Sequence, residues 1–168
     1  MNNSIDNPKT NIEIEIEMEN GGIISAELYP EIAPITVENF VTLIEDNFFD
    51  GLIFHRVIPG FMSQGGGYDA QGVHHDASSI KGEFEKNGVR NDLKHTRGVL
   101  SMARTMFPNS ASSQFFIMHD DAPHLDGQYA AFGKVTSGMG VVDEIAEAPT
   151  DYQDKPIEDI VIKTIRLV

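Results

Sequence analysis

The sequence predicts a mainly β fold, a barrel or a sandwich with helices covering its open ends. Residues 12–19 alternate isoleucine or methionine with glutamate, a period of two that is typical of a strand with one buried face. Short β-prone runs recur as far as the C-terminus, whereas only two segments have the periodicity of an amphipathic helix. The length of 168 residues is enough for one domain with a substantial core.

Local residue patterns predict each element in turn. Residues 20–22, Asn-Gly-Gly, provide the positive φ angles of a tight turn, so residues 23–29 return as the second strand of a hairpin. Pro34 suits the first turn of a helix, and apolar residues follow it at helical spacing as far as Ile44. The remaining strands are predicted at residues 52–58, 61–64, 97–103, 113–118, 129–135 and 157–168, and a second amphipathic helix near residues 139–147.

Composition argues against several classes of function. The net charge is −14 with only 12 scattered basic residues, which argues against nucleic acid as a partner because phosphate binding needs clustered lysine and arginine. The chain has no cysteine, which excludes thiolate chemistry and disulfides. No apolar stretch is long enough for a membrane span, and residues 1–10 lack the apolar core of a signal peptide. We therefore expect a flexible polar N-terminus over residues 1–10, a single domain over residues 11–168, and a monomeric, cytoplasmic protein that does not bind membranes.

One arginine in an apolar run points to a kind of chemistry. Residues 53–58 are β-prone and largely apolar, they contain Arg56, and a Pro-Gly turn follows them at residues 59–60. Arginine stays charged at neutral pH, so it cannot act as a general acid or base, but it can aim a fixed fork of donors. Such a side chain suits a reaction in which charge shifts and no proton moves. Rotation about a peptide bond is a reaction of that kind.

Three runs of sequence resemble the cyclophilins, the cyclosporin-binding peptidyl-prolyl cis–trans isomerases. They are Phe-His-Arg-Val-Ile-Pro-Gly-Phe-Met-Ser-Gln-Gly-Gly at 54–66, Leu-Ser-Met-Ala-Arg-Thr at 100–105 followed by Ser-Gln-Phe-Phe-Ile at 113–117, and His-Leu-Asp-Gly-Gln-Tyr-Ala-Ala-Phe-Gly-Lys-Val at 124–135. Their wording is similar to that of the bacterial branch. The resemblance implies a closed eight-stranded antiparallel barrel capped by two helices. It also implies peptidyl-prolyl isomerase activity without a cofactor or metal, with proline-containing peptides and unfolded or partly folded client proteins as partners.

The chemistry of that reaction suggests a role for the arginine. Rotation is slow because it costs about 18–20 kcal/mol of resonance energy. In the twisted transition state the lone pair localises on the prolyl nitrogen, so a donor placed there stabilises that state and has little to bind in the planar one. Arg56 is the candidate donor, and the resemblance makes Phe61 and Gln64 the other catalytic residues. The resemblance further implies an apolar seat for the proline ring made by Phe61, Met62, Phe116 and Leu125, peptide-holding groups at Gln64, Gln114 and the backbone of Arg104, and further substrate-binding positions at His55, Ala103, His124 and Tyr129.

Other polar residues admit different interpretations. Strand alternation places His55 on the face opposite Arg56, which favours a structural role over acid–base catalysis. His74, His75 and Asp76 could suggest a metal site, but adjacent side chains rarely converge on one ion, so we predict none. No nucleophile–base arrangement is evident, which argues against a hydrolase. A catalytically inactive peptide-binding module is the main alternative, and the presence of all three catalytic positions favours catalysis.

The chain departs from the best-known eukaryotic cyclophilins in three places. His124 stands where they usually carry tryptophan, and Tyr129 where they usually carry histidine. The tryptophan position contributes strongly to cyclosporin binding in the family, so we expect cyclosporin to bind this protein weakly. Met106 and Phe107 lie in a stretch that is one residue longer than in the eukaryotic pattern, and we expect them to reshape the subsite for residues preceding the proline.

Overall fold

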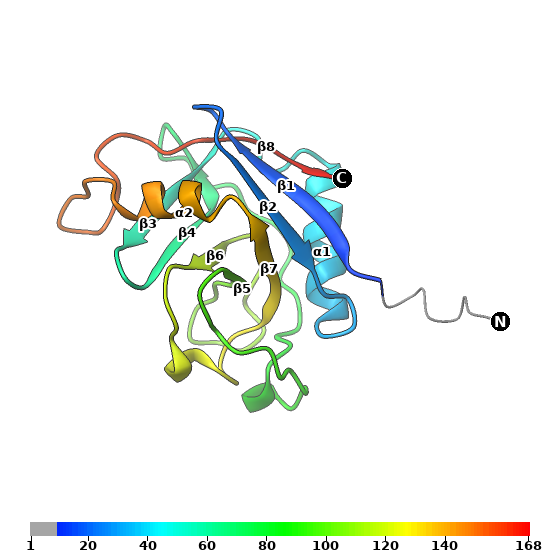
Figure 1. The fold of residues 1–168 in the computed structure, drawn as a ribbon. Coiled ribbons are helices and arrows are strands. Elements are labelled where there is room, and N and C mark those ends of the chain that lie inside the picture. The colour runs from blue at the N-terminus through cyan, green and yellow to red at the C-terminus, as the bar shows by residue number, and fades with distance from the viewer. Residues whose placement is uncertain (1–9) are drawn as a thin grey trace.

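The computed structural model describes residues 10–168, which form one antiparallel eight-stranded sheet and two α-helices (Figure 1). The strands follow each other across the sheet in the order β3-β4-β6-β5-β7-β2-β1-β8. Their bounds are Ile12–Met18 (β1), Ile23–Leu28 (β2), Leu52–Ile58 (β3), Met62–Asp69 (β4), Val99–Met102 (β5), Phe115–Met118 (β6), Ala131–Ser137 (β7) and Ile162–Leu167 (β8). The helices are Pro34–Glu45 (α1) and Met139–Ala146 (α2). The N-terminus that we predicted to be flexible lies, except for Thr10, outside the described residues.

The sheet curls until its two end strands meet, which makes a nearly closed barrel. Ile53 in β3 forms an isolated antiparallel bridge with Val161, just before β8. Two backbone hydrogen bonds support this seam, from Gly51 N to Ile162 O at 2.9 Å and from Phe54 N to Ile160 O at 3.0 Å. The mainly β barrel with two helices that the sequence predicted is therefore confirmed.

Alternation in β1 has the predicted effect. Ile14 and Ile16 are fully buried, while the glutamates that alternate with them along β1 point to the other face of the sheet. There Arg166 of β8 contacts Glu15 at 2.9 Å and Glu17 at 2.8 Å, so the outer face is held by ion pairs. The Arg166 guanidinium holds the pKa of Glu17 below its usual value.

The two faces of β6 pack into two separate apolar clusters. Phe115 and Ile117 point into the main cluster inside the barrel, where Phe40 of α1 lies 5.2 Å from the Phe115 ring. Phe116 and Met118 point the other way, into a smaller cluster with residues of β4, β5 and β7 and of the segment after β6. Helix α2 adds Val142 and Ile145 to the main cluster, so the two helices cover the barrel from different sides (Figure 1). The smaller cluster on the outer face positions the site described below.

The start of α1 receives its cap from a distant residue. Ala33 precedes the helix and makes no side-chain cap. Instead, the buried Glu83 carboxylate accepts hydrogen bonds from Thr36 N at 2.7 Å, from Thr36 Oγ1 at 2.7 Å and from Ile35 N at 3.2 Å. A carboxylate is favourable at this position because the first helical N–H groups have no partner within the helix.

Strand β4 runs from Met62 to Asp69, several residues beyond the predicted end at residue 64. The extension contains three glycines, which give no apolar alternation and so hid the strand in the sequence. Two of them are needed for close packing. A Cβ atom at Gly65 would lie 2.7 Å from Ile53 O, and one at Gly67 would lie 2.5 Å from the Gln114 side chain.

No helix formed by residues 10–168 is both long and apolar enough to cross a membrane.

Candidate active site

Sheet register brings the central site residues into one row across four strands. Arg56 of β3 lies opposite Gln64 of β4, Gln64 lies opposite Phe116 of β6, and Phe116 lies opposite Ser101 of β5. Side chains that are directly opposite on neighbouring antiparallel strands share one face of the sheet. The row therefore places a cation, an amide and an aromatic ring next to one another on the outer face of the barrel.

The polar end of this row is a short chain of hydrogen bonds. The exposed Arg56 donates from Nη1 to Gln64 Oε1 at 3.3 Å, and Gln64 donates from Nε2 to Gln114 Oε1 at 2.9 Å. Gln64 uses one amide group to contact both partners, which limits its freedom and orients the guanidinium. The other guanidinium N–H groups of Arg56 make no hydrogen bond to a described residue, so they can reach a substrate.

The apolar end of the row contains the predicted proline seat. Met62, Phe116 and Leu125 are at most 7% exposed and belong to the smaller cluster, and Phe61, Ala103 and Tyr129 pack against it half-buried. The His124 ring stacks on that of Phe61 at an interplanar angle of 30°, with centroids 5.8 Å apart, and Tyr129 meets Phe116 edge-on at 5.9 Å. The structure thus brings the predicted seat together with its rim, directly beside the polar end.

The strand pairing is irregular around His55. The pairing shifts between Phe54, which lies opposite Gly65, and Arg56, which lies opposite Gln64, so β3 has one more residue here than β4. Phe54 and Val57 both belong to the main cluster, so the alternation of side chains is interrupted once between them. His55 packs against the Tyr68 ring at 4.8 Å. Burial, together with the Arg56 charge, lowers the pKa of His55 to about 4.

Arg104, which was expected to act through its backbone, also has a structural use for its side chain. It donates from Nη2 to Gln128 O at 2.6 Å and from Nη1 to Thr105 O at 2.9 Å. Its guanidinium carbon lies 4.6 Å from the centre of the Tyr129 ring and 4.7 Å from that of Phe84. The side chain therefore joins the two loops that flank the seat, a role that no local sequence pattern indicated.

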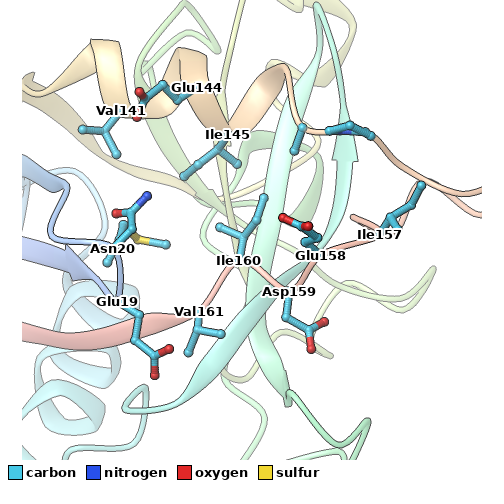
Figure 2. A pocket seen from close by; sticks show the side chains of 13 residues that line it. Glu19, Asn20, Val141, Glu144, Ile145, Ile157, Glu158, Asp159, Ile160 and Val161 are labelled. Carbon is cyan, nitrogen blue, oxygen red and sulfur yellow. The ribbon is translucent and has the colours of Figure 1, made fainter.

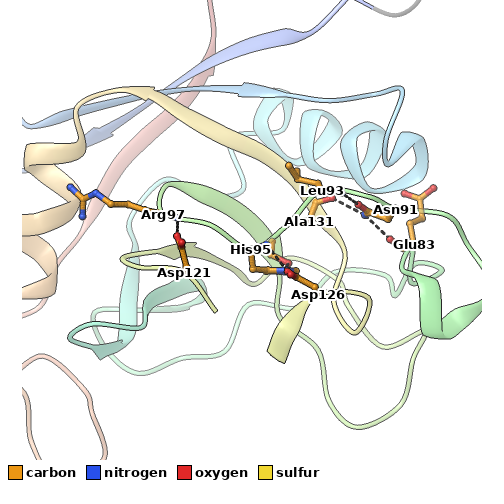
Figure 3. Close-up of polar contacts among 9 residues, drawn as sticks. Glu83, Asn91, Leu93, His95, Arg97, Asp121, Asp126 and Ala131 are labelled. Atoms are coloured by element: carbon orange, nitrogen blue, oxygen red, sulfur yellow. Dashed lines mark hydrogen bonds and ion pairs between the residues drawn. The ribbon is translucent and has the colours of Figure 1, made fainter. Parts of the chain in front are cut away.

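A second layer of polar contacts, formed by alternate residues of the segment 91–97, supports the loop that carries His124, Leu125 and Tyr129 (Figure 3). Asn91 Nδ2 donates to Glu83 O and to Ala131 O, both at 2.9 Å. The backbone N–H of His95 donates to Asp126 Oδ1 at 2.6 Å, and that of Arg97 donates to Asp121 Oδ1 at 3.0 Å. These bonds anchor both ends of the loop to the barrel.

The imidazole of His95 forms a Ser-His-Asp arrangement that the sequence analysis missed. Its Nδ1 lies 3.0 Å from Asp126 Oδ1 and its Nε2 lies 2.8 Å from Ser101 Oγ. Ser101 is 0% exposed and His95 is 1% exposed, so the serine cannot meet a substrate as a nucleophile would. Burial lowers the pKa of His95. The imidazole ring instead stacks against the Phe116 ring, with centroids 6.1 Å apart, and so supports the predicted seat from its buried side.

A cavity of about 280 Å³ adjoins the site between the loop after β4 and the loop after β5. The loop after β4 contributes His74 and Asp76 to its lining. The segment between β5 and β6 contributes the other lining residues, Ala103, Arg104, Thr105, Ser110, Ser112 and Gln114. The neighbouring His75 pairs with Asp69 at 2.9 Å. Met106 and Phe107 are 84% and 68% exposed in the loop after β5. Among residues 10–168, no group of three or more His, Asp or Glu side chains is arranged to hold a metal ion.

Comparison with known proteins assigns the chain to a family. The model of the family "Cyclophilin type peptidyl-prolyl cis-trans isomerase/CLD" matches residues 13–167. The chain belongs to this family. Peptidyl-prolyl cis-trans isomerase ppi1 of Schizosaccharomyces pombe is 43% identical over 159 residues, which cover 94% of this chain and 99% of that protein. A peptidyl-prolyl cis-trans isomerase of Acinetobacter baylyi is 44% identical over 162 residues, and the match covers 90% of this chain and 84% of that protein.

The solved structures agree with the relatives. The crystal structure of a cyclophilin type peptidyl-prolyl cis-trans isomerase from Cryptosporidium parvum superposes with a TM-score of 0.82 at 30% identity, covering 95% of this chain and 98% of that one. The same protein crystallised in the presence of the dipeptide Ala-Pro gives a TM-score of 0.79 at 31% identity, with 93% and 98% covered. The chain is thus a cyclophilin-type peptidyl-prolyl cis–trans isomerase.

Proposed function

We propose that this cyclophilin accelerates rotation about Xaa-Pro bonds by hydrogen bonding from Arg56 to the prolyl nitrogen in the twisted transition state. The observation that carries the proposal is the cross-strand row, in which a cation with free donors lies beside an apolar seat. The seat takes the proline ring, and the hydrogen bond that Arg56 donates to Gln64 Oε1 limits the motion of Arg56 before substrate arrives. A donor that is already oriented costs little reorganisation when the lone pair forms.

The proposed substrates are proline-containing peptides, and the proposed clients are unfolded or partly folded proteins whose folding is limited by proline isomerisation. Support comes from the seat described above and from the Cryptosporidium parvum relative crystallised in the presence of Ala-Pro. A protease-coupled assay on a short Xaa-Pro peptide tests the activity. A second assay, the refolding rate of a protein with a slow proline phase, tests the client role, and an unchanged slow phase would contradict it.

Turnover is expected to change by less than about twofold between pH 6 and pH 8, because an arginine donor does not titrate there. The pKa of His55 is lowered to about 4, so its imidazole is protonated only below this range and stays neutral across it. The measurement is kcat/KM for one Xaa-Pro peptide at constant ionic strength. An inflection at about pH 6.5, the ordinary pKa of histidine, would implicate a titrating histidine and contradict a purely arginine-based mechanism.

Replacing His124 with tryptophan is expected to tighten cyclosporin binding by about 10- to 100-fold while changing turnover by less than about threefold. His124 is exposed and stacks on Phe61, so its ring lies at the rim of the seat. An indole adds apolar contact area and keeps one N–H donor. Titration of the drug against both proteins gives the affinities, with Tyr152→Trp as a control at a position that is 93% exposed. Unchanged affinity in the His124 variant would remove this residue from the drug's contact surface.

A further inference from the structure

We propose that the cavity between α2 and the segment preceding β8 is a second binding site, which takes a partner polypeptide segment bearing an aliphatic side chain flanked by lysine or arginine. The cavity has a volume of about 670 Å³, within the range of about 300–1,000 Å³ that is usual for ligand sites. None of its lining residues belongs to the isomerase site. The proposal is therefore independent of the mechanism proposed above.

The floor and walls of the cavity are apolar. Val141 and Ile145 descend from α2, and Ile160 faces them from the segment before β8, with the Ile145 and Ile160 side chains directed toward one another (Figure 2). Ile157 lines the same cavity and is 68% exposed, which is unusual for so large an aliphatic side chain. Covering this surface removes apolar area from water, so an aliphatic side chain is the ligand group that suits the floor.

The rim of the cavity is acidic on all its segments. Glu19 lies just after β1, Glu144 lies on α2, and Glu158 and Asp159 lie before β8. Asp159 pairs with Lys155 at 3.2 Å, whereas no described residue makes a hydrogen bond or ion pair with the side chain of the other three. No lysine or arginine lines the cavity.

The position of these charges specifies the occupant. Because the carboxylates come from three separate segments around one apolar floor, a complementary ligand must present cations on more than one side of an apolar group. A peptide in which basic residues flank an aliphatic residue meets this requirement. A phosphate-bearing or acidic partner would meet only like charge here, and the net charge of −14 adds to that repulsion.

The test uses a fluorescein-labelled peptide, Lys-Arg-Ile-Leu-Arg-Lys, which contains no proline and so avoids the isomerase seat. Anisotropy titrations at about 0.15 M salt, where exposed charges are screened beyond about 8 Å, compare it with Lys-Arg-Ser-Ser-Arg-Lys. We expect the Ile-Leu peptide to bind at least tenfold more tightly than the Ser-Ser peptide. Saturating Ala-Pro dipeptide should not displace it. Equal binding of the two peptides would reduce the effect to diffuse charge attraction and overturn the proposal.

Two kinds of variant locate the site. The double variant Glu144→Lys/Glu158→Lys reverses the rim charge, and Ile157→Ser removes an exposed apolar wall, so each should weaken the Ile-Leu peptide at least tenfold. The matched control Glu45→Lys/Glu147→Lys makes the same charge change at exposed positions at or just after a helix end, outside the cavity, and should weaken it less than threefold. Turnover of an Xaa-Pro peptide should stay within about twofold in all three proteins. Equal weakening in the control, or amide chemical shifts that map the peptide elsewhere, would overturn the proposal.

Discussion

The Arg56→Ala variant is expected to lose roughly 10²–10³-fold in kcat/KM for Xaa-Pro peptides, the usual loss when one transition-state donor is removed. The reason is that the prolyl nitrogen accepts a hydrogen bond only once the amide has twisted, so the lost interaction belongs to the transition state. Arg56 is exposed, and among the described residues its side chain makes a hydrogen bond to Gln64 alone, so the fold should be little affected. The measurement is kcat/KM in a protease-coupled assay, with thermal unfolding recorded alongside.

Two further variants make this experiment decisive. Arg56→Lys keeps the charge but loses the planar fork of donors, and we expect activity between those of the wild type and the alanine variant. Arg90→Ala removes an arginine whose side chain pairs with Asp92 in an exposed position, and it should leave turnover unchanged. If Arg56→Ala keeps more than about half of the wild-type activity, the arginine mechanism is wrong even though the family activity stands.

The Glu83→Ala variant is expected to lower the free energy of unfolding by about 2–4 kcal/mol, because it leaves three donors at the start of α1 without their buried acceptor. For a chain of this size the loss corresponds to a fall of roughly 5–15 °C in the unfolding midpoint. The cost is larger than for an ordinary helix cap, since Glu83 is 2% exposed and water cannot replace it without a rearrangement. Differential scanning calorimetry at neutral pH measures the effect.

Conservative and neighbouring substitutions distinguish the cap from a general loss of packing. Glu83→Gln keeps the shape and one acceptor oxygen, so it should lose about half as much stability as the alanine variant. Glu85→Ala, two residues along and exposed, should shift the midpoint by less than about 2 °C. A small shift in Glu83→Ala, comparable with that of the Glu85 variant, would show that α1 does not depend on this carboxylate.

Local periodicity was sufficient to predict elements such as β1 and α1, because each carries an apolar face of one period, whereas the closed barrel was predicted from the resemblance to the cyclophilins. It could not predict the extent of β4, whose three glycines have no side chains to alternate. It also could not predict the cap at α1, because Glu83 and Thr36 are 47 residues apart and nothing in either local sequence refers to the other.

The candidate site also has a part that the sequence predicted and a part that it did not. The three runs that resemble the cyclophilins pointed to Arg56, Gln64 and Phe116, which the register then brings together. The supporting residues were missed, because contacts such as that between His95 and Ser101 depend on which strand lies beside which loop. The segment 91–97, in which every residue except Leu93 is polar, gave no local signal for these contacts. The prediction for His55 assumed unbroken alternation along its strand, and the shift in strand pairing beside it is not visible in a run of β-prone residues.

The seam between β3 and the segment preceding β8 affects how an unfolded chain can bind to such a protein. A strand at an open sheet edge presents free N–H and C=O groups, and any extended polypeptide can add to it as a further strand. Here the end strand β3 is occupied along its length, through Phe54 N to Ile160 O and Val57 N to Asp154 O. Under the proposed function, we therefore expect a client to bind through side chains on the outer face. It is not recruited into a growing sheet, and so the molecule offers aggregation-prone chains no template at this edge.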